Sequence, residues 1–545
     1  MDRPSWRPTV VTGWVSAGVV AAVALVCCLT GFASVSSAHS SRFTLTVCRT
    51  GCGFSEIAPA IATAKSGDTI RIASGTYTGG FTIDTSIKLL GAGAHVTIIR
   101  GGGPVVTIGS SGVSREPTVS IYGVTITGGI TRSSPESKSM TGEVGVIADG
   151  GGVEIAPGAT VAIANSAITG NRVAPIRAVA DGPTCPSGPC PHAQAAGGGI
   201  ENSGKLTLTN TRVSDNRVGS AAGLSTLASD ADGGGIEDLE GALTIVNSTI
   251  EGNQASATAP NGRFADSGAI EAVAGVVTIS NSSVMNNSAT LAASWPDSVQ
   301  TAAVAGGIHI EAGVSSAMIS DTKIIGNSVS MTNTAGGTTA FSGGLHTDGV
   351  FTLSNDVIAD NSVHSAALGS TGNAEGDSGA GEMGGTIRNT HFTGNTVTVS
   401  SANGDVNASA GAVIFAGTLT TSIVSDNHVS ASSPNGTVTL IAGGLQSGGP
   451  LTLTHTSVSG NTAKAAGRSG TARGGGIFAA LVPNGPPPGR LTLVDSSVTN
   501  NALSGSPHIT VRGGGLFATF KLTLTNSSIS GNTPDDCSGN SCGAA

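Results

Sequence analysis

The chain has 545 residues, of which 82 are glycine, 11% are charged and 3% are aromatic. This composition suits tight coils with small side chains and is poor for a conventional globular core. The formal net charge of −9 argues against nucleic acid as a partner, because binding to nucleic acid needs a basic patch.

The first 38 residues predict a secretory signal peptide. Arg3 and Arg7 precede an apolar run over residues 13–33, and Ser36, Ser37 and Ala38 form a small-residue cleavage site. The run is also long enough to cross a bilayer, so an uncleaved membrane anchor is the alternative. Both interpretations predict a secreted, extracellular or cell-surface protein, with membrane contact only through this segment.

Residues 39–130 predict an N-terminal cap followed by irregular coils. Apolar residues recur at helical spacing over residues 55–65, and short strand-like runs follow near residues 69–72, 82–83, 87–90, 96–99, 105–108 and 119–126. A cap is physically required at the end of a stacked sheet, because an open end exposes unpaired backbone and apolar core.

Regular repeats occupy residues 131–533. Each of the eleven copies closes on an asparagine, with an apolar residue three positions earlier and Gly, Asp or Asn one position earlier. The closing asparagines are Asn171, Asn216, Asn253, Asn287, Asn327, Asn361, Asn395, Asn427, Asn461, Asn501 and Asn532. Gly, Asp and Asn tolerate a left-handed backbone, so we expect a tight corner just before each closing asparagine.

Each copy holds three short runs with period-two alternation: Gly-Gly-x-Ile, Leu-Thr-Leu and Val-x-x-Asn. Strand-length runs repeated at a nearly constant period indicate a solenoid, in which stacked coils bury a continuous core. The predicted fold is an all-β, right-handed parallel β-helix of about fourteen coils. We expect its corner asparagines to hydrogen-bond to one another and to the turn backbone.

The pairing of Gly-Gly-x-Ile with a later x-x-Asn resembles the repeats of polymorphic outer-membrane proteins and adhesin-type surface β-helices, within the pectin-lyase-like superfamily. Phe392-Thr393-Gly394-Asn395 keeps the Phe-x-x-Asn form of that family, and the other ten copies have Ile or Val in place of Phe. The resemblance implies the β-helix fold. It implies no single activity, since the superfamily mixes lyases, hydrolases and adhesins.

The segments between a closing asparagine and the next Gly-Gly predict hairpin-like side arms. Residues 396–399 are expected to pair with residues 406–409 across Asn403-Gly404, and residues 429–431 with residues 438–440 across Asn435-Gly436. Arms on one side of a solenoid can form a binding face. Tolerated variation in loop length remains an equal alternative.

Six cysteines outside the signal segment form three close pairs: Cys48 with Cys52, Cys185 with Cys190, and Cys537 with Cys542. In a secreted chain such pairs predict local disulfides, the last of them in a C-terminal tail of residues 534–545. Metal binding would need four converging ligands, and these pairs lie at the start, the side and the end of the predicted rod.

An acidic stripe is the main candidate site. A glutamate follows the apolar residue of the Gly-Gly-x-Ile run in four successive coils, and three aspartates precede the same glycines; these are Glu154, Glu201, Glu237, Glu271, Asp149, Asp232 and Asp266. Carboxylates one coil apart repel, so they need a cation, an interleaved arginine or raised pKa values. Arg172 and Arg217 follow closing asparagines and are the candidate arginines. The stripe could hold Ca²⁺ or a sugar polymer, or it could be a solvated surface.

The sequence thus favours a secreted or cell-surface protein with a non-catalytic, adhesin-like role in binding polysaccharides or cell-surface glycans. No catalytic motif rises above background and no cofactor is predicted, although the stripe could hold Ca²⁺. A polysaccharide lyase or glycoside hydrolase is the alternative, but the only Asp-Asp pair, Asp535-Asp536, lies in the tail. A second alternative is a structural or ice-contacting rod. The ice-contacting role is suggested by a threonine that recurs nine positions before most closing asparagines. The simpler explanation is that Thr is favoured on exposed strands.

Overall fold

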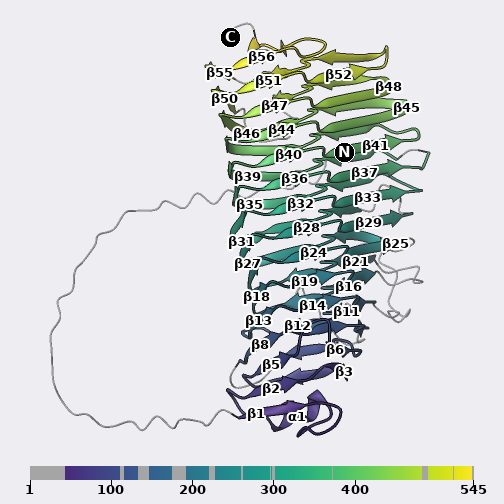
Figure 1. Ribbon diagram of the computed structural model, residues 1–545. Coiled ribbons are helices and arrows are strands. Elements are labelled where there is room, and N and C mark those ends of the chain that lie inside the picture. The colour runs from purple at the N-terminus through teal and green to yellow at the C-terminus, as the bar shows by residue number, and fades with distance from the viewer. Residues whose placement is uncertain are drawn as a thin grey trace, which may run out of the picture.

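The computed structural model describes residues 43–110, 116–132, 146–174, 192–219, 228–258, 262–294, 296, 301–370, 372–480, 489–519 and 521–542. The predicted signal peptide lies outside these residues. The described residues form a right-handed parallel β-helix, with strands stacked in successive coils along one rod (Figure 1). The predicted fold class is therefore confirmed, and the one-per-coil strands of the 14-stranded sheet give fourteen coils.

Each regular coil contains five strand positions, which stack into five columns. Columns A1 and A2 together form sheet A, one column forms sheet B, and columns C1 and C2 form sheet C in the side arms. Long bent strands of later coils span A1 and A2, or C1 and C2.

Column A1 contains the Gly-Gly-x-Ile runs. Its strands are β4 (Phe81–Ile83), β7 (Val106–Ile108), β12 (Val153–Ile155), β17 (Ile200–Asn202), β22 (Ile236–Asp238), β49 (Ile477–Ala479), β54 (Leu516–Ala518) and β57 (Cys537–Ser538). Column A2 contains the Leu-Thr-Leu runs. Its strands are β1 (Thr44–Val47), β2 (Thr69–Ile72), β5 (Lys88–Gly91), β8 (Thr118–Tyr122), β13 (Thr160–Ala164), β18 (Lys205–Thr209), β23 (Ala242–Val246), β50 (Arg490–Val494) and β55 (Lys521–Thr525). The strands that span both columns are β27 (Ile270–Ser280), β31 (Ile308–Ser320), β35 (Leu345–Ser354), β39 (Gly381–Arg388), β43 (Val413–Thr420) and β46 (Leu445–Thr454).

Sheet B contains the Val-x-x-Asn runs. Its strands are β3 (Gly75–Thr78), β6 (Thr97–Arg100), β9 (Thr125–Thr127), β14 (Ala167–Thr169), β19 (Arg212–Ser214), β24 (Thr249–Glu251), β28 (Ser283–Met285), β32 (Lys323–Ile325), β36 (Val357–Ala359), β40 (His391–Thr393), β44 (Ile423–Ser425), β47 (Ser457–Ser459), β51 (Ser497–Thr499) and β56 (Ser528–Ser530).

The side arms leave the coil after the closing asparagine and return to the next Gly-Gly. The outgoing strands of column C1 are β10 (Ile130–Thr131), β15 (Arg172–Val173), β20 (Arg217–Gly219), β25 (Gln254–Thr258), β29 (Ser288–Ala293), β33 (Ser328–Asn333), β37 (Ser362–Ala367), β41 (Thr396–Ser401) and β52 (Ala502–Gly505). The returning strands of column C2 are β11 (Val146–Asp149), β16 (His192–Ala196), β21 (Ala228–Asp232), β26 (Gly262–Asp266), β30 (Ala302–Val304), β34 (Thr338–Phe341), β38 (Ala374–Asp377), β42 (Val406–Ser409) and β53 (Ile509–Arg512). Two strands, β45 (His428–Ile441) and β48 (Thr462–Arg473), span both columns.

The pairing expected within the arms is wrong. Strand β41 pairs in parallel with β37 and β45, and β42 pairs in parallel with β38 and β45, so the two halves of an arm hydrogen-bond to neighbouring coils. Their inward side chains instead form a second core of small residues, mostly Ala and Val, separate from the core inside sheets A and B. Parallel pairing between coils is favoured over pairing within an arm because every arm returns at the same corner, where the next coil offers an unpaired strand edge.

A buried asparagine ladder runs the length of the regular coils. In each of the first ten closing asparagines, Nδ2 donates to Oδ1 of the next closing asparagine at 2.8–3.0 Å. The residue before each closing asparagine has a positive φ, as expected. At the far end, Oδ1 of Asp536 accepts from both the backbone N–H and Nδ2 of Asn532. The predicted ladder is therefore confirmed, and a carboxylate that only accepts hydrogen bonds terminates it.

The N-terminal end of the rod carries the expected cap. Helix α1 (Ile57–Thr63) buries Ile57, Ala60 and Ile61 against the first coils, as the helical spacing predicted. Among the described residues, no helix has the length and apolar character that crossing a membrane requires.

Two of the three predicted disulfides are present, one near each end of the rod. Disulfides join Cys48 to Cys52 and Cys537 to Cys542, so these two predictions are confirmed. The third predicted disulfide joins Cys185 to Cys190. Both cysteines lie outside the described residues, so this disulfide stays a prediction.

Candidate functional site

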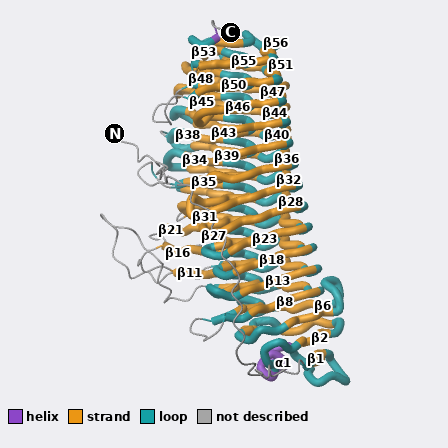
Figure 2. Tube along the Cα trace, turned by 90° about the vertical axis from the view of Figure 1, so that its left-hand side faces the viewer, coloured by secondary structure: helices purple, strands orange, loops and turns teal. Residues whose placement is uncertain are grey.

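The predicted stripe lies at the corner where column C2 turns into column A1. Glu154, Glu201, Glu237 and Glu271 are direct neighbours in successive coils of sheet A, in the register that the repeat predicted. On the other side of the corner, Ala196 separates Asp149 from the neighbouring pair Asp232 and Asp266. We call these seven carboxylates the acidic corner. Figure 2 shows the coils from the side where sheet A and the returning arms meet.

The turn at this corner explains why glycine recurs there. Gly233 has a φ of +56°, and a Cβ atom at this position would lie 2.9 Å from Cβ of Glu237. Glycine therefore lets the backbone turn sharply and brings the aspartate and glutamate columns together. Later coils keep the positive φ with serine or alanine, as at Ser267 and Ser342.

The acidic corner is unusually buried for a set of like charges. Glu201, Glu237 and Glu271 are 7%, 1% and 5% exposed, although their neighbours in the strand point into the main core. Oε2 of Glu237 and Oε2 of Glu271 have no hydrogen-bond partner. Asp149 and Glu154 are part-exposed, in contrast to these three glutamates.

Burial and mutual repulsion raise the pKa values of these groups. Burial, then the charge of Glu154, raises the pKa of Asp149 to about 7. Burial, then the charges of Asp149 and Glu154, raises the pKa of Glu201 to about 8. Burial, then the charge of Asp232 for Glu237 and of Asp266 for Glu271, raises the pKa values of these two glutamates well above the ordinary range. At neutral pH the corner therefore contains neutral carboxyl groups, which donate as well as accept hydrogen bonds.

The structure does not bring the two candidate arginines into this corner. Arg172 and Arg217 are register neighbours in column C1, and both are exposed. Their neighbours Val173 and Val218 point into the second core, so the arginines point away from it on the outgoing side of the arm. The acidic corner lies on the returning side. Arg172 and Arg217 therefore do not supply an arginine base beside the acidic corner in the part of the chain that the structure describes.

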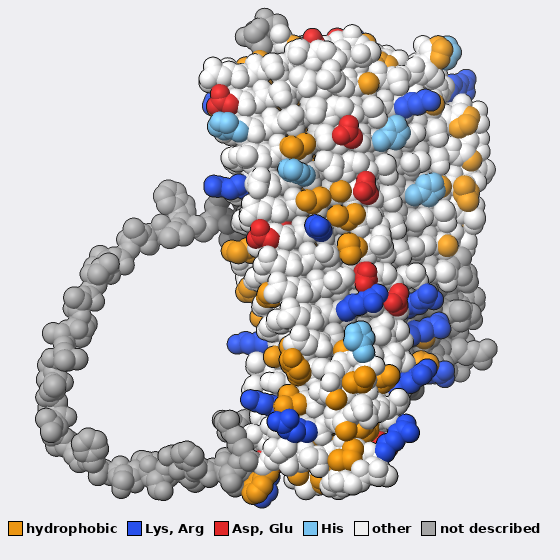
Figure 3. Space-filling model, viewed as in Figure 1, with side chains coloured by type: hydrophobic (Ala, Val, Ile, Leu, Met, Phe, Trp, Pro, Cys, Tyr) orange, Lys and Arg blue, Asp and Glu red, His pale blue; other side chains and the backbone are white. Residues whose placement is uncertain are grey.

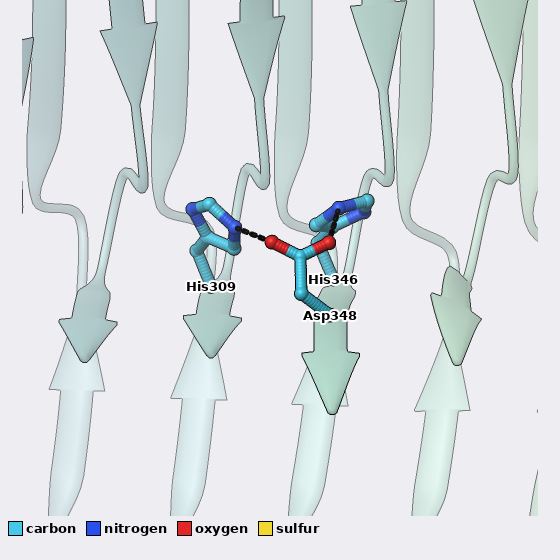
Figure 4. A group of neighbouring side chains, drawn as sticks. All are labelled: His309, His346 and Asp348. Carbon is cyan, nitrogen blue, oxygen red and sulfur yellow. Dashed lines mark ion pairs between the residues drawn. The ribbon is translucent and has the colours of Figure 1, made fainter. Parts of the chain in front are cut away.

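A cluster of acid and histidine side chains follows the acidic corner along the same column. His309 is the register neighbour of Glu271, and His346 is the register neighbour of His309. Nδ1 of His309 lies 2.9 Å from Oδ1 of Asp266, and the carboxylate of Asp348 lies between the two imidazoles (Figure 4). We call Asp266, His309, His346 and Asp348 the histidine cluster.

Opposite charges strongly perturb this cluster. Burial alone would lower the pKa of His309, but the charge and hydrogen bond of Asp266, the contact with Asp348 and the charge of Glu311 raise it to about 10. His309 and His346 hold the pKa of Asp348 well below its usual range. Asp266 was predicted as part of the acidic stripe, whereas His309, His346 and Asp348 were not predicted as site residues. The signal was present as histidine at one repeat position in two successive coils, followed by a His-x-Asp alternation.

Beyond the histidine cluster the corner changes character. The column continues through Glu382, Ile414 and Gln446 to Phe478 and Phe517. The two phenylalanine rings stack with centroids 5.6 Å apart, and Arg473 lies over the second ring. Figure 3 shows the opposite side of the rod, where the few acidic side chains are scattered over the surface.

The predicted threonine line is also in register. Thr207, Thr244 and Thr278 are neighbours in successive coils of column A2, and Thr352, Thr386, Thr418, Thr452, Thr492 and Thr523 continue the line after an exposed methionine, Met318. Threonine is favoured at exposed strand positions because it fits the pleated surface. The line therefore has an explanation without ice, and an ice-contacting role stays a prediction.

Comparison with known proteins adds little to this picture. No family model matches the chain, and no curated protein matches it. Among solved structures, the chain is weakly similar to the PL6 family alginate lyase AlyGC, with 9% identity over 86% of this chain and 98% of that chain and a TM-score of 0.16. A likeness at this level carries no argument about activity. The chain is a right-handed parallel β-helix protein whose family the comparisons do not identify.

Proposed function

We propose that this chain is an extracellular, non-catalytic protein that binds a linear glycan along the acidic corner. The observation that carries the proposal is the in-register column of carboxyl groups, of which Asp149 and Glu154 are part-exposed. Neutral carboxyl groups both donate and accept hydrogen bonds, as sugar hydroxyls do. Their spacing of about 4.8 Å from coil to coil offers a repeating set of contacts to a repeating polymer.

Two further observations support this proposal. Asp149 and Glu154 are part-exposed and can contact a ligand directly, whereas the buried Glu237 and Glu271 are less accessible. Disulfides such as Cys48–Cys52 are typical of oxidising compartments, which agrees with the predicted signal peptide. Ca²⁺ held by the carboxylates would extend the same site to glycans that carry acidic groups.

The test is retention of the mature protein on a panel of neutral and acidic polysaccharides, with and without Ca²⁺, while soluble products are followed in parallel. We expect retention on at least one polymer without product release. The double variant Asp149→Asn with Glu154→Gln should weaken retention at least tenfold. Glu251→Gln is the matched control, because Glu251 is a part-exposed glutamate that pairs with Arg212 at 2.6 Å in sheet B, away from the corner.

Two results would contradict this function. Retention on no polymer, or equal retention by the double variant, would remove the acidic corner as a glycan site. Release of products that disappears in Glu201→Gln would instead identify a polysaccharide lyase or hydrolase.

A further inference from the structure

The histidine cluster is assembled by register and alternation. Parallel pairing of β31 with β35 places His309 beside His346, with ring centroids 5.0 Å apart. His346 and Asp348 are two residues apart on β35, so their side chains leave the strand on the same face. Three potential ligands thus converge from two neighbouring coils.

Both imidazoles are oriented from behind by a second group. Nδ1 of His309 contacts Oδ1 of Asp266 at 2.9 Å, and Nδ1 of His346 contacts Oγ of Ser342 at 3.0 Å. Each ring therefore engages a neighbour through Nδ1 and points Nε2 toward Asp348. Histidines that bind metals are commonly held in this way, with the second ring nitrogen hydrogen-bonded to a carboxylate or another polar group.

The Nε2 atoms face a carboxylate at separations that suit a shared ion. Nε2 of His346 lies 3.4 Å from Oδ1 of Asp348, and Nε2 of His309 lies 3.9 Å from Oδ2 of Asp348. Ligand atoms about 2.0–2.1 Å from a tetrahedral Zn²⁺ are about 3.3–3.4 Å apart. The ligand atoms of the three residues all lie within 4.8 Å of one another, so a small adjustment would place them around one ion.

Burial adds an independent indication. His309 is 7% exposed, and its Nε2 has no hydrogen-bond partner. A buried polar atom without a partner is destabilising, and a bound ion would satisfy it. Asp348 is the accessible member, with a side chain that is 46% exposed, so an ion can enter from solvent.

From this geometry we infer that Nε2 of His309, Nε2 of His346 and the carboxylate of Asp348 bind one divalent transition-metal ion of the Zn²⁺ class. Two imidazoles and one carboxylate suit Zn²⁺ better than Ca²⁺, which prefers oxygen ligands. Three protein ligands leave a position open to water or to an oxygen atom of a ligand. Asp266 and Ser342 act as positioning residues. This inference does not depend on glycan binding.

A second arrangement uses the same residues without a metal. Asp266, Glu271 and His309 also lie within 4.8 Å of one another, and a protonated His309 between Asp266 and Asp348 would form two ion pairs. In that arrangement the cluster stabilises the corner and takes up no transition metal. The two arrangements can be told apart because only the first binds a transition metal, with an affinity that His346→Gln and Asp348→Asn reduce.

The experiment measures metal content and affinity in the purified full chain. The protein is stripped with chelator, then titrated with Zn²⁺ or with Co²⁺, whose visible absorption reports tetrahedral coordination. We expect one equivalent bound per chain. His346→Gln and Asp348→Asn should each weaken affinity at least tenfold and remove the Co²⁺ spectrum, and Asp266→Asn should weaken it about 10–100-fold.

The matched control is His455→Gln. Nε2 of His455 lies 3.6 Å from Oδ2 of Asp495, but the histidine side chain is 61% exposed, and this pair belongs to no group of three potential metal ligands among the described residues. Its substitution should leave metal binding unchanged. Thermal unfolding without metal checks that Asp348→Asn, the least buried change, keeps the fold.

Two outcomes would overturn the inference. One is the absence of stoichiometric Zn²⁺ or Co²⁺ uptake by the wild-type chain. The other is uptake that persists in both His346→Gln and Asp348→Asn. Loss of metal binding with retained glycan binding would separate this site from the proposed function, because the two assays are independent.

Discussion

Two buried polar columns run along this rod, and they differ in how their members are satisfied. In the asparagine ladder, each amide donates to the next coil through Nδ2 and accepts through Oδ1, as Asn327 does between Asn287 and Asn361. In the acidic corner, Oε2 atoms of Glu237 and Glu271 remain without hydrogen-bond partners. The ladder repeats one residue in eleven coils, whereas the corner changes from acid to histidine to phenylalanine.

The difference follows from the chemistry of the side chains. An amide carries a donor and an acceptor, so identical amides stacked in register satisfy each other without net charge. A carboxylate carries only acceptors and a charge, so identical carboxylates repel unless protons or cations intervene. A column that satisfies itself serves the fold. A column that cannot is the place to look for a ligand.

Breaking the ladder should give the largest effect. Asn327→Ala removes the acceptor for the backbone N–H and Nδ2 of Asn287 and the donor to the carbonyl of Val284. Several buried groups then lack partners, so we expect destabilisation by about 3–5 kcal/mol. Denaturant unfolding measures this. Asn532→Ala, at the more exposed end of the ladder, should cost clearly less, and equal losses would contradict the ladder account.

Replacing a glutamate of the acidic corner by glutamine should stabilise the protein, whereas breaking the ladder destabilises it. The size of this stabilisation should depend on pH. The folded-state pKa of Glu201 is raised to about 8 from 4.5, so the folded state binds the extra proton. The stabilisation that this proton provides is complete below about pH 4.5 and is lost as pH rises through about 8. Glu201→Gln should therefore stabilise the protein by about 2–4 kcal/mol at pH 9 and change little at pH 4.

The control for this prediction is Glu251→Gln, which replaces a glutamate paired with Arg212. It should not stabilise the protein at pH 9. Unfolding midpoints of wild type and both variants, measured from pH 4 to pH 9, make the comparison. If the unfolding midpoint of Glu201→Gln changes with pH in parallel with that of the wild type, the raised pKa of Glu201 does not cause the loss of stability at high pH.

Most of the fold could be predicted because its signals are repeated. The closing asparagine, the apolar residue three positions earlier and the turn residue before it recur in every copy, so drift in single coils does not hide them. The arms could not be predicted as well. Alternation of small apolar residues in β41 and β42 fits antiparallel pairing within an arm and parallel stacking between coils equally, and only the neighbouring coils decide between them.

The candidate site shows the same limit. The register of Glu154, Glu201, Glu237 and Glu271 follows from the repeat, and so was predicted. Asp348 could not be found that way, because it lies in the connection between columns A1 and A2, where β31 and β35 differ in length and the register shifts. The candidate metal ligands depart from the repeat, and a repeat pattern averages such departures out.

The smallest expected effect concerns a single acid at a third corner, where neighbouring coils have threonine. Asp356 is 1% exposed; its Oδ1 accepts the backbone N–H of Thr322 at 2.8 Å, and its Oδ2 has no hydrogen-bond partner. The equivalent Thr390 donates its hydroxyl proton to the carbonyl of Arg388 at 3.1 Å. An ionised aspartate cannot donate in this way. Burial raises the pKa of Asp356 to about 7, so stability should fall as pH rises from about 4 to about 7.

Asp356→Thr should restore the hydroxyl of the neighbouring coils and stabilise the protein by about 1–2 kcal/mol at pH 8, with little change at pH 4. Asp426→Asn, at an exposed corner position, controls for the removal of a negative charge elsewhere. If both substitutions stabilise the protein equally, net charge explains the gain. If only Asp356→Thr does, the rule drawn from the two columns extends to one residue: a buried group at a stacked position stabilises the fold when it can donate as well as accept.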